Sequence, residues 1–386
     1  MIPLKYNIGN LRARRISTLM TVVGIGVVIA VMISMMALQN GVHSTVVSSG
    51  SKDNLIVMRE GSAAELSSWV TKDAFRVMRT LPGIAKDSSG APMISPELVI
   101  IFKIPKKDNP KGSNVLVRGV TPAAFAIRPY VRIVEGRMFR PALNEVIVAR
   151  RIRDRFVKTA LGDTFQFGPQ KYTVVGIFDA QGTAFDSEMW CDADFLGQAR
   201  KRDAYSSVIL RPNDRDAFES IKAAIKNDNR LKLGVTSEYQ YYADQTTGLI
   251  GIVILVAIVT FFMTIGAILG TMNTMFSAIS SRGRELATLR ALGFKRRTVI
   301  LSVVIESAFI ALLGGLAGLL LALPINAIST GTTNFQTFSE VAFNFRVDGH
   351  VALNGILIAL IAGIVGGMLP ALRAARTPIP TALREI

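Results

Sequence analysis

The sequence contains little cysteine and histidine, and this shortage argues against several classes of catalytic site. Of 386 residues, one is cysteine and two are histidine, so no disulfide can form within the chain. His43 and His350 are far from each other and from Cys191 in the sequence, which gives poor support to a metal site or a Ser-His-Asp triad. We expect Cys191 to be a buried thiol that packs as a small apolar side chain.

A phosphate-binding loop is also missing. The pattern GxxxxGK[ST] occurs nowhere, so the chain does not bind ATP through that device. We therefore expect this chain to be no enzyme and to hold no catalytic, metal or cofactor site.

Charged residues are missing from four long stretches. Half of the residues are hydrophobic, the mean hydropathy is +0.38 and the formal net charge is +16, which is typical of a membrane protein with basic flanks. A helix needs about 20 residues to cross about 30 Å of hydrocarbon. The sequence predicts four transmembrane helices, near residues 17–38, 249–275, 299–323 and 353–372.

The first apolar run also has some features of a signal peptide, because Arg12, Arg14 and Arg15 precede it. It is longer than the roughly 7–15 residues of a signal-peptide core, and no clear small-x-small cleavage site follows it directly. We therefore interpret it as a membrane helix.

Basic residues gather in three segments that lie next to the predicted transmembrane helices. Lys and Arg close to span ends mark the cytoplasmic side. This rule places both termini in the cytoplasm and residues 39–248 and 326–350 on the opposite side. The basic residues are Lys5, Arg12, Arg14 and Arg15 before the first span, Arg282, Arg284, Arg290, Lys295, Arg296 and Arg297 between the second and third, and Arg373, Arg376 and Arg384 after the fourth.

The segment 39–248 is long enough to fold as a domain with its own core. Two stretches favour helices: the one after Thr71, with apolar residues at helical spacing, and the one that places Phe218, Ile221 and Ile225 on one face. Runs rich in β-branched and aromatic residues favour strands. We expect an α+β extracytoplasmic domain with βαβ units and two subdomains. The strand-like runs are DNLIVM, ELVIIFKIP, NVLVRGV, NEVIVA, DTFQF and KYTVVGIFD.

A basic strip, RGRELATLRALGFKRR, separates the second and third apolar stretches. Read as a helix from Arg284 to Leu292, it places Leu286, Leu289 and Leu292 on one apolar ridge, and Gly293 ends it. Such a helix suits the headgroup layer, with its arginines on anionic lipid. It equally suits a lever that receives a push from a cytoplasmic partner, and the residues themselves leave both readings open.

Glu306 is the one charged residue inside the third apolar stretch. An ionised side chain at that depth is costly unless it faces protein or water, so we favour a structural bond to a neighbouring helix or chain over a proton relay. Close helix packing is predicted at Gly315 and Gly318, and Gly314 and Gly318 have the GxxxG spacing.

Four segments of the chain resemble one protein family, and together they cover nearly its whole length. The strongest is NTMFSAISSRGRELATLRALGFKRRTVI, residues 273–300, which resembles the FtsX-type permease signature of MacB-like ABC transporters. NLRARRISTLMTVVGIGVVIAV resembles the family's amino-terminal cytoplasmic helix and first span, and LPALRAARTPIPTALREI its carboxy-terminal end. The stretch from NEVIVARRIRDRF to KYTVVGIFD resembles the MacB-type extracytoplasmic domain.

The resemblance implies a domain organisation and a coupling site. It implies a cytoplasmic amphipathic segment at 1–16, an FtsX-like domain at 249–386, a coupling helix within 282–297 and a cytoplasmic tail at 373–386. The coupling helix would sit on an ATPase subunit, and a separate chain is implied because this one carries no ATPase domain; ATP and Mg²⁺ would belong to that chain. The residues that match the motif are Arg282, Arg284, Glu285, Leu286, Leu289, Arg290, Ala291, Leu292 and Gly293.

The resemblance also implies a function, namely a permease of the inner membrane that dimerises with a second copy or a related permease and binds two ATPase copies. The implied mechanism is mechanotransmission. In it, ATP hydrolysis would move the outer domain, and the outer domain would expel a drug, peptide, glycolipid or lipoprotein. Membrane lipid, an adaptor and an outer-membrane channel are further expected partners, and nucleic acid is not. The alternatives are a lipoprotein-releasing permease of the Lol type and an FtsX-like regulator of a cell-wall hydrolase.

Overall fold

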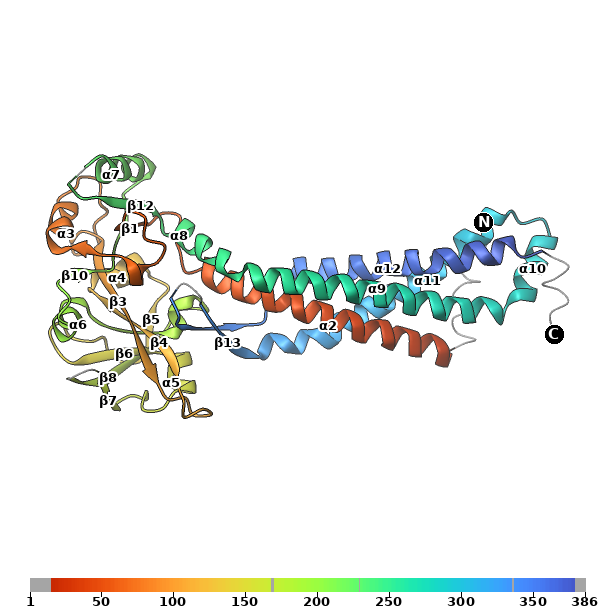
Figure 1. Ribbon diagram of the computed structural model, residues 1–386, viewed down its shortest axis with the longest axis horizontal. Helices are drawn as coiled ribbons and strands as arrows, with labels where there is room; N and C mark the ends of the chain where they lie inside the picture. Colours follow the sequence, from red (N-terminus) through yellow and green to blue (C-terminus); the bar gives the residue numbers. More distant parts are fainter. Residues whose placement is uncertain (1–14, 168–169, 229, 335–336, 379–386) are drawn as a thin grey trace. The chain divides into compact units, whose positions relative to one another are not determined.

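The computed structural model describes residues 15–167, 170–228, 230–334 and 337–378. Most of the predicted amino-terminal segment and the last residues of the tail lie outside these ranges. The chain divides into two compact units (Figure 1). We call them the helical unit, which comprises Met1–Gly41, Gly251–Ile328 and Phe345–Ile386, and the strand-rich unit, which comprises Val42–Ile250 and Ser329–Asn344.

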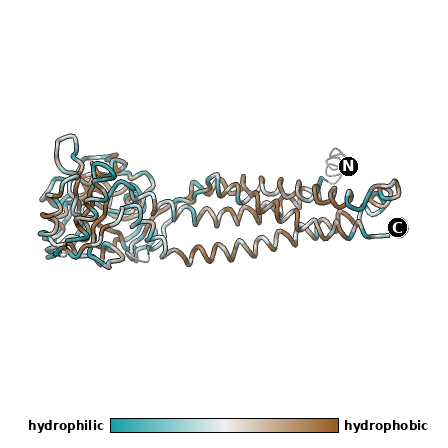
Figure 2. Tube along the Cα trace, turned by 90° about the horizontal axis from the view of Figure 1, so that it is seen from above, coloured by the Kyte–Doolittle hydropathy of each residue, from teal (hydrophilic) through white to brown (hydrophobic). Residues whose placement is uncertain are grey.

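Among the described residues, four helices are long and apolar enough to cross a membrane, as the sequence predicts. Figure 2 shows that hydrophobic residues dominate along them. Each helix is longer than its predicted apolar core, because backbone hydrogen bonding continues into a polar flank. The helices are α2 (Arg15–Val47), α9 (Ile250–Ser280), α11 (Arg296–Ala322) and α12 (Gly349–Arg376).

Glycines allow these helices to approach one another closely. A Cβ atom on Gly318 of α11 would lie 2.6 Å from the carbonyl oxygen of Gly26 in α2, and one on Gly363 of α12 would lie 2.3 Å from the Cβ of Ala311 in α11. A Cβ on Gly315 would lie 3.0 Å from that of Ala359. The predicted close-packing positions on α11 are therefore confirmed, and they hold α11 between α2 and α12.

Helix α9 packs far less tightly than the other three long helices. Along it, the buried described residues are Val256, Ala267, Thr271 and Met275. Large apolar side chains such as Phe261 and Phe262 are more than half exposed. This helix therefore leaves an apolar face free for lipid or another chain.

The strand-rich unit is built on one ten-stranded sheet with the order β12-β1-β11-β3-β4-β9-β6-β8-β5, and β7 pairs with β8. The six predicted strand-like runs all form strands. The sheet consists of β1 (Leu55–Arg59), β3 (Ile94–Ile104), β4 (Ser113–Val120), β5 (Arg132–Gly136), β6 (Glu145–Ala149), β7 (Thr164–Phe167), β8 (Gln170–Asp179), β9 (Glu188–Asp192), β11 (Ser207–Leu210) and β12 (Leu233–Ser237).

Short helices cover the sheet, and two of them match the predicted ones. Thr71 caps α3 by accepting a hydrogen bond from the Ala74 N–H at 3.2 Å. Helix α7 buries Ile221 and Ile225, the face that the spacing indicates. The helices are α3 (Lys72–Arg79), α4 (Ala123–Ile127), α5 (Arg150–Arg155), α6 (Ala193–Ala199), α7 (Arg215–Asn227) and α8 (Glu238–Gln245), with the 3₁₀ turns η1 (Glu65–Ser67), η2 (Ala184–Ser187) and η3 (Thr246–Leu249).

Two hydrophobic clusters of described residues share this sheet. One contains Ile221 and Ile225 with side chains of β1 and β11. The other gathers around Trp190 and includes Cys191, which is 1% exposed. Burial raises the pKa of the Cys191 thiol, so it stays protonated and packs as an apolar side chain, as expected.

The segment between α11 and α12 departs from the predicted domain boundary. The sequence assigns all of residues 249–386 to one domain, but Ser329–Asn344 belongs to the strand-rich unit. There β13 (Ser329–Thr333) and β14 (Glu340–Asn344) form an antiparallel hairpin, and Val341, Ala342 and Phe343 are buried. This burial of apolar side chains explains why the segment folds with the strand-rich unit.

Candidate coupling site

The basic strip folds as the short helix α10 (Gly283–Ala291), within one residue of the predicted bounds. Gly293 has a φ of 94°, which a glycine adopts without strain. The Gly293 N–H donates to the Arg290 carbonyl at 3.1 Å, and the Phe294 N–H donates to the Leu289 carbonyl at 3.2 Å. These two bonds form a Schellman motif, so the chain reverses at Gly293 as the sequence indicates.

One face of α10 packs inside the helical unit. Leu286 is 7% exposed and Ala287 is 4% exposed. At the start of the helix, the Arg282 side chain is also largely buried, at 11% exposure. These three residues of the motif therefore orient the helix within its own unit, and the remaining motif residues are the ones on or near its surface.

Arg282 connects α10 to the charged residue inside α11. Its Nη1 lies 3.1 Å from both Oε1 and Oε2 of Glu306, and its Nε donates to Glu285 at 3.2 Å. Glu306 is 6% exposed. The predicted structural bond from Glu306 to a neighbouring helix is confirmed, and this ion pair fixes the start of α10 against α11.

The other face of α10 is open. Leu292 is 73% exposed, and Arg284, Glu285, Thr288 and Ala291 are also exposed. The prediction that three leucines form one apolar ridge is therefore wrong, because they do not share one face of the helix. A spacing of three residues falls about 60° short of a full turn, so Leu286 and Leu292 point about 120° apart.

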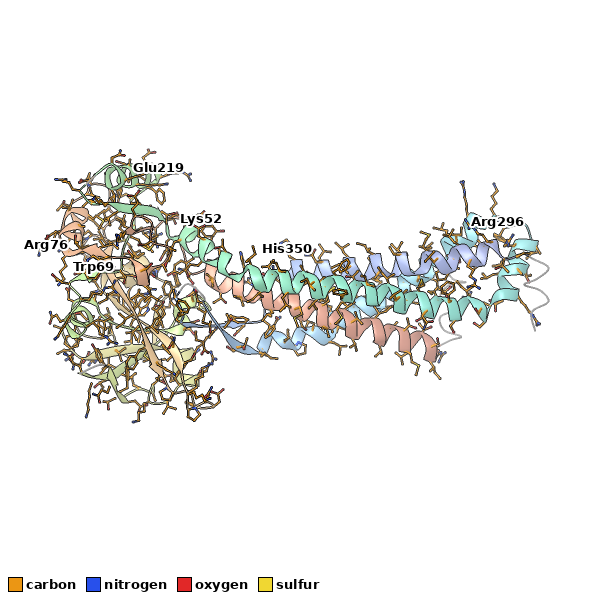
Figure 3. All side chains as sticks on the ribbon, viewed as in Figure 1. Lys52, Trp69, Arg76, Glu219, Arg296 and His350 are labelled. Atoms are coloured by element: carbon orange, nitrogen blue, oxygen red, sulfur yellow. The ribbon has the colours of Figure 1, made fainter. Side chains whose placement is uncertain are left out.

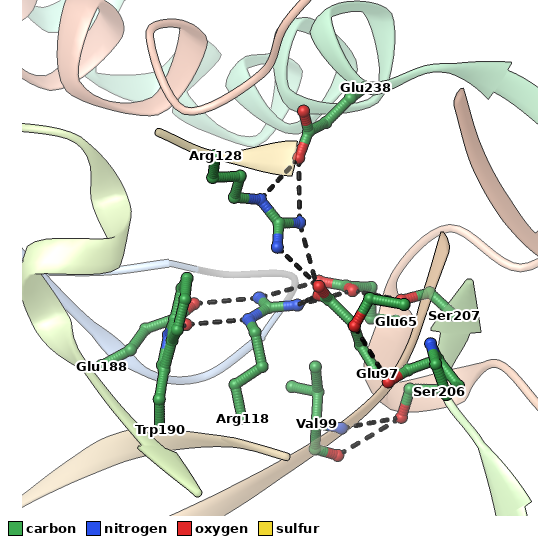
Figure 4. Close-up of polar contacts among 12 residues, drawn as sticks. Glu65, Glu97, Val99, Arg118, Arg128, Glu188, Trp190, Ser206, Ser207 and Glu238 are labelled. Atoms are coloured by element: carbon green, nitrogen blue, oxygen red, sulfur yellow. Dashed lines mark hydrogen bonds and ion pairs between the residues drawn. The ribbon is translucent and has the colours of Figure 1, made fainter. Parts of the chain in front are cut away.

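In the strand-rich unit, a second polar site is fully buried. Arg118 on β4 is 1% exposed and bonds three carboxylates (Figure 4). Two of these contacts are bidentate: with Glu188 at 2.8 and 2.9 Å and with Glu65 at 2.8 and 3.0 Å. The third is with Glu97 at 2.7 Å. Bidentate guanidinium-carboxylate pairs are strong and directional, so this cluster holds β3, β4, β9 and η1 in one arrangement.

Arg128 connects the cluster to two segments of the chain, one that follows α2 and one that precedes α9. It pairs with Glu97 at 2.5 Å and with Glu238 at 2.9 Å. Glu238, the first residue of α8, also accepts from the Asn54 Nδ2 at 2.8 Å and the Ser51 N–H at 3.1 Å. Ser51 and Asn54 follow α2 in the chain, and α8 precedes α9, so both segments are anchored in the same buried cluster.

Burial and arginine charge shift the pKa values of two of these carboxyl groups in opposite directions. Burial raises the pKa of Glu188 despite the charge of Arg118. Burial also acts to raise the pKa of Glu65, but the charge and hydrogen bonds of Arg118 outweigh it, and the pKa is lowered. In both groups the charge of Arg118 opposes the effect of burial and favours the ionised carboxylate.

The β13–β14 hairpin is anchored to the same unit by charge and backbone contacts. Lys106 pairs with Glu340 at 2.5 Å, and Arg155 also contacts this carboxylate. The Ala342 N–H donates to the Ser187 hydroxyl at 2.7 Å, and Arg151 donates to the Ala342 carbonyl at 2.9 Å. The segment that joins α11 to α12 is therefore part of the strand-rich unit and not a free loop.

Within the part of the chain that the structure describes, no group of three His, Cys, Asp or Glu side chains is placed to bind a metal. The fold and these sites define a class of protein with four apolar helices, a strand-rich insertion after the first and a short amphipathic helix between the second and third.

The family within this class follows from sequence comparison. Residues 18–228 match the MacB-like periplasmic core domain, and residues 236–379 match the FtsX-like permease C-terminal domain. The chain therefore belongs to the MacB/FtsX family of ABC transporter permeases.

Relatives in this family include fused and separate permeases. The macrolide export ATP-binding/permease protein MacB of Bordetella avium is 24% identical over 412 residues, which cover 97% of this chain and 59% of that protein. MacB of Vibrio parahaemolyticus is 24% identical over 414 residues, with 99% and 60% covered. An uncharacterized ABC transporter permease of Methanocaldococcus jannaschii is 22% identical over 403 residues, with 96% and 95% covered. The chain thus spans about 60% of the length of the two MacB proteins.

Proposed function

We propose that this chain is the permease subunit of an ABC transporter and that a separate ATPase chain docks on the exposed face of α10. The family membership and the open, amphipathic surface around Leu292 support this assignment. ATP and Mg²⁺ are bound by the partner and not by this chain. We infer from the basic residues near the span ends that α10 lies on the cytoplasmic side and the strand-rich unit on the opposite side of the inner membrane.

The surface of α10 has the features of a docking element. Leu292 supplies an exposed apolar anchor at the helix end, and Arg284 and Glu285 supply charges of both signs beside it. Buried anchors contribute most interface energy, and charges at the rim determine orientation. We infer that a displacement of α10 passes to the membrane helices through its inner face, which the Arg282–Glu306 pair holds against α11.

The strand-rich unit is connected to the long helices through anchored segments. The segments after α2 and before α9 end at the Glu238 cluster, and the α11–α12 connection forms the docked hairpin. We infer that ATP-driven displacement of the helices is transmitted through these anchors to the strand-rich unit, which drives extrusion of cargo. Candidate cargoes are a drug, peptide, glycolipid or lipoprotein, and an adaptor and outer-membrane channel would continue the path in a cell with two membranes.

We infer that the permease forms a dimer, and the uncovered apolar face of α9 offers a surface for that contact. A transmembrane helix with this much exposed apolar surface contacts either lipid or another helix. A second copy or a related permease, with one ATPase on each α10, completes the assembly that we propose.

Pull-down of the partner ATPase tests the docking assignment. Leu292→Asp places a carboxylate in an apolar contact, and an unpaired buried charge costs several kcal/mol, so affinity should fall by at least about tenfold. Leu161→Asp is the matched control, because Leu161 is also exposed but lies in the strand-rich unit. Full ATPase retention with Leu292→Asp would contradict the assignment and return α10 to the role of a headgroup anchor.

A further inference from the structure

A pocket of about 370 Å³ lies within the helical unit, bordered by α10 and the last turns of α9 and α12. This volume is in the range of small-ligand sites. The docking face of α10 does not border it, because the pocket lies against the buried Leu286 and Ala287. The lining residues that matter most are Phe276, Ile279, Arg290, Pro370, Arg373 and Thr377.

Two arginines, Arg290 and Arg373, border this pocket. Arg290 donates through Nη1 to the Thr377 carbonyl, and the Arg373 guanidinium lies 5.7 Å from the Phe276 ring centroid. Across the described ranges, no Asp or Glu oxygen pairs with either guanidinium, whereas Arg282 nearby pairs with Glu306. Two positive charges therefore border one pocket, and no carboxylate of the described residues neutralises them.

The polarity of the pocket changes along the helices. On α9, Phe276 and Ile279 lie in the last turns of the helix. On α12, Pro370 comes before Arg373, and Thr377 follows the helix end, while Arg290 lies in the last turn of α10. The wall toward the helix middles is therefore apolar, and the end of the pocket is basic. A phospholipid has the same order, with acyl chains below a phosphate.

We propose that this pocket binds an anionic phospholipid, with the phosphate at Arg290 and Arg373 and the upper acyl chains against Phe276 and Pro370. Guanidinium groups bind phosphate oxygens through paired hydrogen bonds, and basic pockets between membrane helices bind anionic headgroups. The lipid would contact α10 and α12 together. Its occupancy would therefore restrain the helix on which, in the proposed function, the ATPase docks.

Lipid binding to the full-length permease in detergent, measured by native mass spectrometry with dimyristoylphosphatidylglycerol, tests this site. One arginine near the membrane surface contributes about 1 kcal/mol, so Arg373→Gln should weaken binding about fivefold. Arg376→Gln is the matched control, since Arg376 is an exposed arginine in the same helical turn and does not line the pocket. Equal binding by the Arg373→Gln variant and the unchanged protein would overturn the proposal.

A second variant keeps both arginines but fills part of the pocket with a larger side chain. Ala374 lines the pocket, and Ala374→Phe should reduce lipid binding at least as much as Arg373→Gln if the lipid enters the pocket. Unchanged binding would overturn the proposal. Monodisperse elution shows that each variant folds.

Two further ligands identify the bound chemistry. Dimyristoylphosphatidylcholine should bind more weakly, because its choline cancels the phosphate charge, and inorganic phosphate at equal concentration should not displace the bound lipid. Equal binding of phosphatidylcholine, or displacement by phosphate, would overturn the assignment to an anionic lipid. No ATPase is present in these measurements, so they succeed or fail independently of the pull-down.

Discussion

The buried arginine on β4 allows a quantitative test of the strand-rich unit. Arg118→Met keeps much of the side-chain length but removes the cation that bonds Glu65, Glu97 and Glu188. Of these, Glu97 keeps its contact with Arg128, while Glu65 and Glu188 lose their guanidinium partner. Breaking a buried ion pair from one side costs about 3–5 kcal/mol, because a carboxylate remains buried without compensation.

The expected loss is large enough to measure by thermal unfolding. For a unit of this size, 1 kcal/mol shifts the melting temperature by about 2–4 °C, so Arg118→Met should lower it by about 10 °C. The assay uses Trp190, which is fully buried and donates to the Glu188 carboxylate at 2.8 Å. Replacing the exposed Trp69 by Phe leaves Trp190 as the only tryptophan that emits.

A surface ion pair provides the matched control. Arg137 pairs with Glu145 but has an exposed side chain, so Arg137→Met should leave the melting temperature nearly unchanged, because water screens exposed pairs. A melting temperature that Arg118→Met also leaves unchanged would refute the reasoning that the cluster stabilises this unit.

Two further predictions concern the hairpin and the packing of the long helices. Burial acts to raise the pKa of Glu340, but the hydrogen bond from Lys106 and nearby charges outweigh it and lower the pKa; the stabilisation is therefore present above the unfolded pKa of about 4.3 and lost as pH falls through the lower folded value. The protection factors of the β14 amides should fall below about pH 4, and in Glu340→Gln they should be lower already at neutral pH. Equal protection in that variant would contradict this. Gly363→Val should prevent the close approach of α12 to Ala311 and strongly lower the yield of folded protein. Gly270→Val should be tolerated, because a Cβ atom at Gly270 has no neighbouring atom within 4 Å. Equal yields would show that the α11–α12 contact does not depend on this glycine.

Local features of α10 and the strands are predictable from sequence because their causes are local. The backbone at position 293 has a positive φ, which glycine adopts without strain, and α10 ends there. Thr71 caps α3 through its own hydroxyl. The leucine ridge fails for a physical reason as well: repeated spacing of three drifts around a helix, so the same residues divide between an inner and an outer face. Only the packing of α10 against its own unit decides which leucine is free.

The buried charge cluster depends on contacts between distant segments, which the sequence does not reveal. Arg118 and Glu97 are separated along the chain from Glu188 and Glu238, and the sheet order brings them together. A signal does exist, because Arg118 lies within the apolar run NVLVRGV and Glu97 begins ELVIIFKIP. Charged residues inside buried strands need opposite charges as partners, but the partner's identity follows only from the fold.

Photo-crosslinking to the ATPase tests the central claim most directly. A benzoylphenylalanine at Leu292 and one at Leu286 place the same reactive group at the exposed and buried faces of α10. In membranes that contain both chains, the account predicts a crosslink to the ATPase from position 292 and none from position 286. No ATPase product from position 292 in an assembled, ATP-hydrolysing complex would contradict docking on this face.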